Sequence, residues 1–431
     1  MAKKRINVVT MGCSKNLVDS EVLLNQLERG KFEVLHDSCE SNFDAVFINT
    51  CGFIYDAKQE SIDMILSYVK AKKRGDIGKL YVIGCLSERY RKDLEEEIPE
   101  VDRYFGKFEL KEIVDELKVS YQPEYIYERK ITTPSHFAYL KISEGCNRSC
   151  SFCAIPMMTG RYKSRTIEDL VKETHYLAEK GVKEILVIAQ DLSYYGIDIY
   201  GENRLAELVE KISEINGIEW IRLHYLYPTK FPFEILTIMR ENPKVCKYLD
   251  IPLQHISNQV LKNMLRHISR EETESLIKKI REEVPGVTIR TTALVGFPGE
   301  TEQDFEELKQ FVRETKFERL GVFPYSNEEG TYASKKFDDN ISDEIKQARA
   351  EEIMELQLSI TDELSQQKIG QVLKVIVDRK EGGFFIGRTE FDSPEVDGEV
   401  LISSAFELNE GEFVNVKITG VEDYDLFAQV E

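Results

Sequence analysis

The feature that most constrains this 431-residue chain is a set of three closely spaced cysteines, Cys146, Cys150 and Cys153, placed directly after a short apolar strand. Their CxxxCxxC spacing lets one loop present thiolates to three irons of a 4Fe–4S cluster, which leaves the fourth iron without a protein ligand. Zinc is the alternative, but it usually takes four closed ligands, and no fourth Cys or His lies nearby in sequence. A loop of this kind at the carboxyl end of a strand is typical of β/α barrels, which build their active sites there.

The region around this loop, residues 136–326, alternates apolar strands with helical segments. The pattern predicts a partial (β/α)6 barrel, shorter than a full eight-fold barrel. Its expected strands are 138–143, 184–191, 220–226, 248–254, 288–297 and 319–326. A long amphipathic helix is predicted next, over 342–367. The residues of its apolar face are Ile353, Leu356, Ile360 and Leu364.

The first 125 residues show the pattern of a parallel α/β domain, with strands and helices in alternation. The expected strands are 6–13, 44–51 and 80–85, and the expected helices are 20–28 and 56–70. Each strand ends in a cysteine, namely Cys13, Cys51 or Cys85. One such cysteine would usually be a buried structural residue, but the carboxyl ends of parallel strands meet at one sheet edge. Three cysteines in the same topological position therefore indicate a second iron–sulfur site.

The last part of the chain, residues 366–431, changes to short strands and turns. The expected strands are 372–377, 383–388, 399–402, 413–418 and 426–430, with turns at the Gly-Gly and Asp-Gly pairs. This pattern predicts a small all-β barrel. The segment before the central barrel, 121–135, contains two prolines and is predicted to be a linker.

The overall charge is acidic, with 57 basic and 77 acidic residues and a formal net charge of −20. Such a surface repels phosphate backbones and suits a basic partner, although simple solubility is the plainer interpretation of net charge alone. The amino terminus lacks an apolar signal region, and no apolar run reaches the length of a membrane span, so a cytoplasmic protein is expected. Eight cysteines in that reducing compartment favour metal binding or catalysis over disulfides.

The CxxxCxxC loop, with aromatic Phe152 before its last cysteine, resembles the radical S-adenosylmethionine (SAM) superfamily. The resemblance implies that the open iron binds the methionine part of SAM and that the reduced cluster cleaves the sulfonium to a 5′-deoxyadenosyl radical. The cofactor supplies this chemistry, and the protein supplies position and exclusion of water. Cofactor-binding residues are expected at other strand ends. They are Phe152, Gln190, Gln254, Gly296 and Gly299.

The amino-terminal cysteines lie in motifs that are similar to those of the methylthiotransferases. The motifs are Gly12-Cys13-Ser14-Lys15-Asn16, Asn49-Thr50-Cys51 and Gly84-Cys85-Leu86. In that family three cysteines hold an auxiliary 4Fe–4S cluster whose free iron carries the sulfur to be delivered. The all-β tail resembles a TRAM domain, which recognises substrate in this family. The resemblance implies domains at 1–125, 132–365 and 366–431, and it leaves Cys39 and Cys246 as expected core residues.

Two branches of the family differ in substrate, and the tail favours the one that acts on a protein. Residues 366–431 hold six basic and fourteen acidic residues, a balance of −8, whereas an RNA-binding module should be basic. Three motifs resemble the RimO type, which modifies the β-carbon of an aspartate in the twelfth small-subunit ribosomal protein. They are Ala189-Gln190-Asp191-Leu192-Ser193-Tyr194-Tyr195-Gly196, Pro252-Leu253-Gln254-His255, and Ile155-Pro156 followed by Gly160-Arg161-Tyr162-Lys163-Ser164-Arg165.

The resemblance implies a methylthio transfer that uses two SAM molecules and two 4Fe–4S clusters, with a basic ribosomal protein as substrate and a flavodoxin-like or equivalent reductase as electron donor. Membrane partners and a direct nucleic-acid substrate are not expected. One alternative is a tRNA adenosine methylthiotransferase with the same chemistry. Another is a non-catalytic iron–sulfur binding or sensor protein, in which both clusters would be closed.

Overall fold

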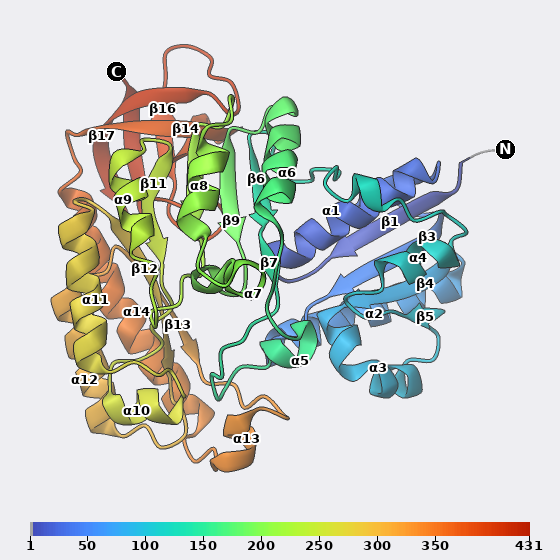
Figure 1. Cartoon of the computed structure of the whole chain (residues 1–431), viewed down its shortest axis with the longest axis horizontal. Helices are drawn as coiled ribbons and strands as arrows, with labels where there is room; N and C mark the ends of the chain where they lie inside the picture. Colours follow the sequence, from blue (N-terminus) through green and yellow to red (C-terminus); the bar gives the residue numbers. More distant parts are fainter. Residues whose placement is uncertain (1–2) are drawn as a thin grey trace. The chain divides into compact units, whose positions relative to one another are not determined.

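The computed structural model describes residues 3–431, which divide into two compact units (Figure 1). The first unit contains the chain up to residue 133 together with 139–147 and 153–176. The second contains 134–138, 148–152 and 177–431. Among the described residues, no helix combines the length and the apolar character that crossing a membrane requires.

The first unit is built on a five-stranded parallel sheet in the order β2-β1-β3-β4-β5, which confirms the predicted α/β domain. Its strands are β1 (Arg5–Thr10), β2 (Glu33–His36), β3 (Phe43–Thr50), β4 (Ile77–Gly84) and β5 (Arg103–Tyr104). Its helices are α1 (Ser14–Arg29), α2 (Tyr55–Arg74), α3 (Cys85–Glu97) and α4 (Leu110–Glu116), followed by the 3-10 turn η1 (Pro123–Tyr125). The two predicted helices are thus present, and α1 begins six residues earlier than expected. Helices α3 and α4 were not predicted.

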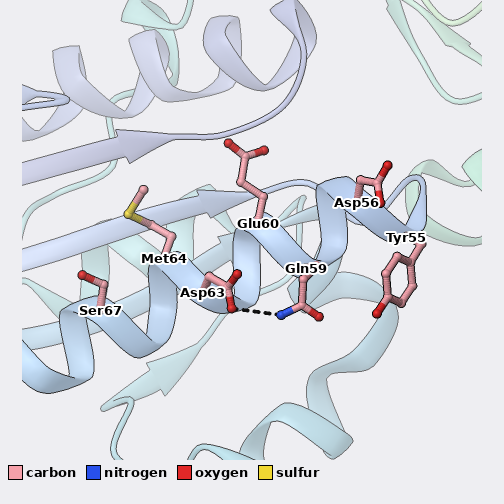
Figure 2. Close-up of a pocket in the computed structure, with 7 residues that line it drawn as sticks. All are labelled: Tyr55, Asp56, Gln59, Glu60, Asp63, Met64 and Ser67. Atoms are coloured by element: carbon pink, nitrogen blue, oxygen red, sulfur yellow. Dashed lines mark hydrogen bonds between the residues drawn. The ribbon is translucent and has the colours of Figure 1, made fainter.

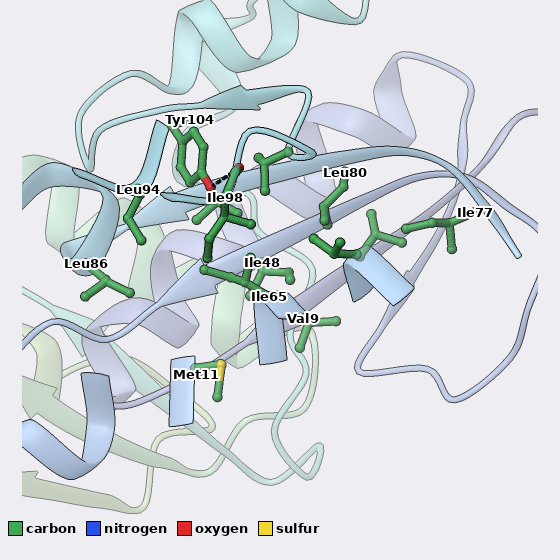
Figure 3. Close-up of a cluster of buried hydrophobic side chains, with 14 of the residues drawn as sticks. Val9, Met11, Ile48, Ile65, Ile77, Leu80, Leu86, Leu94, Ile98 and Tyr104 are labelled. Atoms are coloured by element: carbon green, nitrogen blue, oxygen red, sulfur yellow. Dashed lines mark hydrogen bonds between the residues drawn. The ribbon is translucent and has the colours of Figure 1, made fainter. Parts of the chain in front are cut away.

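Both faces of this sheet are buried, because successive strand residues are apolar and point to opposite faces. Val8 and Phe47 lie in one apolar cluster with residues of α1, whereas Val9 and Ile48 lie in another with Ile65 of α2 (Figure 3). Figure 3 also shows the Tyr104 hydroxyl donating a hydrogen bond to the Ile98 carbonyl, at 2.9 Å. Burial of both faces fixes the register of the strands, and so fixes where their carboxyl ends lie.

A short segment of the first unit leads into and out of the CxxxCxxC loop. It contains β7 (Ser143–Glu144), which pairs antiparallel with β8 (Lys163–Ser164), and between them α5 (Ile155–Thr159). Strand β6 (Phe137–Lys141) begins in the second unit, and α6 (Ile167–Glu179) ends there.

The second unit contains the predicted β/α repeat as a six-stranded sheet in the order β13-β12-β11-β10-β9-β6. After β6 its strands are β9 (Glu184–Ile188), β10 (Trp220–Leu223), β11 (Val245–Asp250), β12 (Thr288–Val295) and β13 (Arg319–Pro324). The intervening turns and helices are η2 (Leu192–Tyr194), α7 (Ile197–Tyr200), α8 (Leu205–Ser213), α9 (Glu234–Glu241), α10 (Asn258–Asn263), α11 (Arg270–Glu283), α12 (Glu302–Thr315) and α13 (Tyr332–Lys336). Each strand ends two to four residues before its predicted end, because the chain leaves the ladder to form the site.

The long helix α14 (Asp343–Gln366) follows, close to its predicted range. Ile353 and Ile360 of the predicted stripe are buried, whereas Leu356 and Leu364 are half-buried. Gln357 is buried instead and donates a hydrogen bond to the Phe317 carbonyl at 2.9 Å. Polar residues therefore complete the packed face, since Thr361 and Ser365 are buried as well.

The tail forms the predicted all-β barrel, closed in the order β14-β15-β16-β18-β17. Its strands are β14 (Val372–Glu381), β15 (Phe384–Thr389), β16 (Val400–Ser403), β17 (Phe413–Glu422) and β18 (Asp425–Val430). The barrel packs against the amino-terminal ends of the sheet strands: the rings of Trp220 and Phe413 lie 4.9 Å apart, and the Tyr248 hydroxyl donates to Asp397 at 2.8 Å. The carboxyl ends of β9 to β12 lie at the other edge of that sheet.

The two cysteines outside the motifs differ in their surroundings. Cys246 of β11 is buried beside Trp220 and Tyr248, as expected of a core residue. The expectation for Cys39 is wrong, because Cys39 is exposed. It lies in the loop between β2 and β3, where its neighbours Ser38, Glu40 and Ser41 are polar.

Candidate functional site

Cys13, Cys51 and Cys85 lie at one edge of the first unit's sheet. They follow β1, β3 and β4, and these three strands are neighbours in the sheet. Cys13 lies close enough to the other two thiols to act on them electrostatically. Besides burial, a charge on Cys13 raises the pKa of both Cys51 and Cys85. The structure therefore brings together the three cysteines that strand-end position predicted.

Glycines let the three cysteine loops approach one another. Gly12 has a φ of +86°, and a Cβ built there would stand 2.7 Å from the Cys51 Cβ. A Cβ on Gly52 would stand 2.9 Å from the backbone carbonyl carbon of Cys85. Because both contacts are with atoms that cannot move freely, only glycine permits this spacing.

The side-chain amide of Asn16 makes hydrogen bonds to all three cysteine loops. Its Nδ2 donates to the carbonyls of Met11 and Thr50, each at 3.1 Å, and its Oδ1 accepts from the Cys85 thiol at 3.6 Å. Met11, Thr50 and Cys85 belong to the ends of β1, β3 and β4 respectively. Asn16 therefore acts as a buried spacer that holds the three strand ends in place.

Two of the cysteines stand at the amino-terminal ends of helices. Cys13 is the N-cap residue of α1, and Cys85 is the first residue of α3. Helix amino termini favour negative charge, and so favour a thiolate or an anionic cluster at this edge. Cys85 follows β4 directly, whereas Met11 and Gly12 separate Cys13 from the end of β1.

Burial opposes that charge in the absence of metal. It raises the pKa of the Cys51 thiol and raises the pKa of the Cys85 thiol to about 12. Lys107 acts in the opposite direction on both thiols. Iron binding must therefore displace protons from these cysteines, as is usual for thiolate sites.

The donor set fits an iron–sulfur cluster. It consists of soft sulfur ligands in a glycine-lined wall with a buried cation beside them. Within residues 3–431 no group of three or more Cys, His, Asp or Glu side chains is placed to hold a single metal ion. Cys13, Cys51 and Cys85 would hold the auxiliary cluster.

The CxxxCxxC loop leaves β7 through Gly145, whose φ of +83° and close approach to the Arg161 carbonyl exclude a side chain. The Cys146 amide donates to the Gly160 carbonyl at 3.2 Å, and the Tyr162 amide donates to the Asn147 side chain at 3.1 Å. These contacts fold the start of the loop back onto the segment that follows α5. The loop is therefore held at its first cysteine by its own return segment.

The middle of the loop, residues 148–152, is part of the second unit and is held within it. The Ser151 amide donates to the Met264 carbonyl at 2.9 Å, and the Ser151 carbonyl accepts from Ala333 at 2.7 Å. Phe152, expected to bind cofactor, packs against an apolar cluster that includes Met264 and Phe297. This packing fixes the backbone between Cys150 and Cys153.

Cys150 has two polar neighbours that the sequence did not indicate. Arg266 Nη1 donates to Cys150 Sγ at 3.3 Å, and the Tyr227 hydroxyl lies 3.5 Å from the same sulfur. The guanidinium carbons of Arg148 and Arg266 each lie 4.1 Å from the Tyr227 ring centroid. No motif connects these residues, because Arg266 is 116 positions beyond Cys150 in the chain. Only the fold brings them together.

Arg148 also binds Asp191, which follows β9. Its Nε lies 2.6 Å from Asp191 Oδ2. Burial nevertheless raises the pKa of Asp191. The Asp191 side chain accepts a second hydrogen bond, from the Ser193 amide at 2.9 Å, and so begins the η2 turn. The strand end next to Gln190 is therefore tied to the CxxxCxxC loop.

The other predicted cofactor-binding residues lie at the same edge of the second unit's sheet. Gln190 follows β9, Gln254 follows β11, and Gly296 and Gly299 follow β12. Gln254 has a φ of +77°, a strained conformation for a residue with a side chain. Its amide donates to Thr292 and its carbonyl accepts from Leu294, at 2.8 and 2.7 Å. Two hydrogen bonds to β12 therefore hold Gln254 in this strained conformation, and such strain is typical of functional positions.

Gly296 belongs to a tightly built turn. Its φ is +72°, its amide donates to Glu300 Oε2 at 2.8 Å, and a Cβ there would meet the Lys346 side chain. Gly299 has a φ of +85° and an open surrounding, with Asn263 Nδ2 3.8 Å from a built Cβ. The turn thus has a packed side at Gly296 and an open side at Gly299.

A surface hollow of about 520 Å³ lies along the exposed face of α2 (Figure 2). Its lining residues are Tyr55, Asp56, Gln59, Glu60, Asp63, Met64 and Ser67. Figure 2 shows these side chains on one helix, with Gln59 donating to Asp63 at 2.9 Å. None of its lining residues is a cysteine, although α2 begins only four residues after Cys51.

Three family models match the chain in the order that the fold suggests. They are the uncharacterized protein family UPF0004 over residues 5–106, the radical SAM superfamily over 140–312 and the TRAM domain over 369–430. Among solved structures, the radical SAM methyltransferase TsrM of Kitasatospora setae with tryptophan and a SAM analogue has a TM-score of 0.57 at 16% identity, covering 74% of this chain and 73% of that one. TsrM with cobalamin and a [4Fe-4S] cluster has a TM-score of 0.56 at 15% identity, covering 89% and 77%. At these identities the likeness shows the fold alone.

Curated relatives match over the whole chain. The ribosomal protein uS12 methylthiotransferase RimO of Bacteroides thetaiotaomicron is 56% identical over 431 residues, covering 100% of this chain and 99% of the relative. The RimO proteins of Porphyromonas gingivalis and Flavobacterium johnsoniae are 55% and 54% identical, covering all of this chain and 100% and 98% of the relatives. With three matched domains and this identity over its full length, the chain belongs to the RimO family of methylthiotransferases within the radical SAM superfamily.

Proposed function

We propose that this chain installs a methylthio group on the β-carbon of an aspartate in ribosomal protein uS12. The observation that carries the proposal is the pairing of two three-cysteine sets in a chain that is 56% identical to RimO throughout. One set stands at three adjacent strand ends and the other in the CxxxCxxC loop. A chain with two such sets matches a reaction that needs one site for radical formation and another for sulfur delivery.

The six cysteines divide into two ligand sets. Cys146, Cys150 and Cys153 would hold the cluster that binds SAM. Cys13, Cys51 and Cys85 would hold the auxiliary cluster. When bound, the two 4Fe–4S clusters and SAM supply reductive cleavage of the sulfonium, hydrogen abstraction and the methylthio group itself.

The chain's own residues position these groups. Arg266 and Tyr227 would orient and electrostatically stabilise the Cys150 thiolate. Gln190, Gln254 and the open side of the turn at Gly299 would contact SAM. They follow strands at the carboxyl edge of the second unit's sheet, as does Tyr227, which lies beside Cys150. Phe152 would shape the cofactor site from its apolar contacts.

The charge of the tail supports a basic protein as substrate. Residues 366–431 carry six basic and fourteen acidic residues. Arg388 is buried against Asp378, and Arg379 and Lys380 are paired with Glu399 and Glu407, so most of the remaining surface charge is acidic. Because the barrel packs at the amino-terminal edge of the sheet, it would recognise a basic surface of the substrate away from the reacting aspartate.

The division into domains at 1–125, 132–365 and 366–431 goes with this assignment of roles. The first would carry the auxiliary cluster, the second the SAM cluster, and the third would recognise substrate. A flavodoxin-like or equivalent reductase would supply electrons. The uS12 substrate would place the reaction in the cytoplasm.

The test is product analysis after anaerobic reconstitution. The reconstituted chain is incubated with SAM, sulfide and reductant, in one reaction with uS12 and in another with tRNA. The uS12 and the tRNA are then digested for mass spectrometry. The expected result is a methylthio group on one aspartate of uS12 and none on tRNA adenosine. Modification of tRNA alone would show that tRNA, and not uS12, is the substrate. Absence of 5′-deoxyadenosine in both incubations would favour a non-catalytic iron–sulfur protein.

A further inference from the structure

Four charged side chains form a closed ring beside the auxiliary cysteines. Lys107 Nζ lies 3.0 Å from Asp19 and 3.7 Å from Glu144, while Lys141 Nζ lies 3.0 Å from Glu144 and also pairs with Asp19. Asp19 belongs to α1, the helix that Cys13 caps, and Glu144 lies two residues before Cys146. All four residues belong to the first unit.

Lys107 is the member of the ring that faces the thiols. Its Nζ lies 3.4 Å from Asn16 Oδ1, and the Cys85 thiol donates to the same oxygen at 3.6 Å. Its backbone is fixed as well, because the Lys107 amide donates to Glu88 of α3 at 3.0 Å. Lys107 is therefore built into the same wall as Cys85, which begins α3.

The Lys107 side chain is only 3% exposed, so its charge requires partners. Burial opposes the charge, but Asp19 and Glu144 hold the pKa of the ammonium well above its usual value. The ring thus maintains a permanent cation beside the cysteines. Lys141 contributes to the ring, but the charges that act on it are those of Asp19, Glu144 and Lys107.

A cation here has a specific use if the auxiliary cluster carries sulfur. Hydrosulfide is an anion, and it must approach a cluster that already carries three thiolates, so its addition is opposed by like charge. An ammonium next to the thiols offsets that repulsion and offers an N–H to the incoming sulfur. Hydrosulfide would add as a fourth iron ligand, with no change in the oxidation state of sulfur or iron.

We propose that Lys107 is a positioning residue that holds an anionic sulfur ligand, of the hydrosulfide class, at the open iron of the auxiliary cluster. The proposal rests on the function proposed above, since it requires an auxiliary cluster with an open iron. It adds a residue outside the cysteine motifs and a charge requirement for the sulfur that the site accepts.

The test uses the full chain with Cys146, Cys150 and Cys153 replaced by alanine, so that only the auxiliary cluster is present. Sodium sulfide is titrated into the reduced protein, and binding is followed by the change in the cluster's electron paramagnetic resonance spectrum. Iron content is measured for each variant, so that loss of the cluster is separated from loss of sulfide binding. In this background Lys107→Gln, which keeps polarity but removes charge, is compared with Lys107→Arg.

Lys107→Gln should weaken sulfide binding about tenfold, the size expected for loss of a charge-assisted contact, and Lys107→Arg should restore most of it. Lys141→Met is the matched control, because it opens the same ring without removing the charge beside the thiols. Equal weakening by Lys141→Met and Lys107→Gln would show a structural role and overturn the proposal, as would unchanged binding in Lys107→Gln. If sulfide leaves the spectrum unchanged when Lys107 is intact, the auxiliary cluster has no open iron. That result would contradict the proposed function itself, and not only the role of Lys107.

Discussion

Arg266 donates a hydrogen bond from Nη1 to the sulfur of Cys150 at 3.3 Å. The contact joins the loop after α10 to the middle of the CxxxCxxC motif, and the Arg266 ring contact with Tyr227 keeps the guanidinium in place. Hydrogen bonds to cluster sulfurs are among the factors that set reduction potential. The relationship therefore links a residue outside any motif to the ease of reducing the SAM cluster.

Replacing Arg266 should make that cluster harder to reduce. Arg266→Met removes a positive donor that stabilises the more negative, reduced state, so the midpoint potential should fall by about 60 mV, equivalent to tenfold in a one-electron equilibrium. Redox titration followed by paramagnetic resonance measures it. Arg270→Met, which breaks the exposed pair with Glu274, is the control and should leave the potential unchanged. Equal potentials for wild type and Arg266→Met would contradict the assignment.

Gly12 should be required for the auxiliary cluster. Gly12→Ala places a Cβ 2.7 Å from the Cys51 Cβ at a φ of +86°, so one ligand must move. The variant should retain the SAM cluster and about half of the wild-type iron, and should form 5′-deoxyadenosine without transferring a methylthio group.

Gly75→Ala is the matched control for that variant. Gly75 has nearly the same φ, +85°, but nothing lies within 4 Å of a built Cβ. Both substitutions therefore carry a similar backbone cost of about 1 kcal/mol, and only one disturbs the cysteines. Full iron content in Gly12→Ala, or equal loss in both variants, would show that the close approach at Cys51 is unimportant.

Arg129 should be essential for the stability of the first unit. It is buried between Glu21 of α1 and Glu173 of α6, and each of these side chains is at most 2% exposed. Arg129→Met leaves the buried Glu21 carboxylate without a cation, while Glu173 keeps Arg165, and should cost about 3–5 kcal/mol in the free energy of unfolding, measured by urea denaturation. Arg74→Met, which loses an exposed pair with Asp76, should change it by less than about 0.5 kcal/mol. Comparable values for the two variants would contradict the buried network.

The two cysteines outside the motifs should differ in reactivity and in pH dependence. Burial raises the pKa of the Cys246 thiol to about 12, so it stays neutral, and therefore unreactive, as pH rises from 7 to 9. Exposed Cys39 should be alkylated by iodoacetamide in the same folded, cluster-loaded chain. Peptide mass spectrometry measures both sites, and urea-unfolded chain is the control in which both should react. Labelling of Cys246 as fast as Cys39 in the folded chain would show that β11 is not covered as described.

The sequence was sufficient for the parts of the fold that rest on apolar strands. Runs such as Val-Val-Thr in β1 and Leu-Val-Ile in β9 are apolar on both faces, which is typical of buried parallel strands. The strand ending at Ile188 was predicted to reach Asp191, although only Ala189 continues the apolar run past the ladder. Hydropathy cannot distinguish the last residue of a strand from the first residue of the site.

Elements with weak periodicity were missed for a different reason. Helix α3 buries only Leu86, Ser87 and Leu94, and its other residues are polar, so it has no clear apolar stripe. It is nevertheless the helix that positions Cys85. Functional residues brought in by the fold were missed as well, because Lys107 and Arg266 belong to no motif. Arg266 contacts Cys150, and Lys107 contacts Asn16, which also accepts from the Cys85 thiol, only through chain-distant packing.

The central claim is that radical formation at the CxxxCxxC loop is coupled to substitution at the aspartate β-carbon of uS12. The most direct measurement supplies uS12 with deuterium at the aspartate β-carbon and follows the label by mass spectrometry. One deuterium should appear in 5′-deoxyadenosine for each aspartate that gains a methylthio group. Methylthio-aspartate formed with unlabelled 5′-deoxyadenosine, or 5′-deoxyadenosine formed while the aspartate stays unmodified, would contradict it.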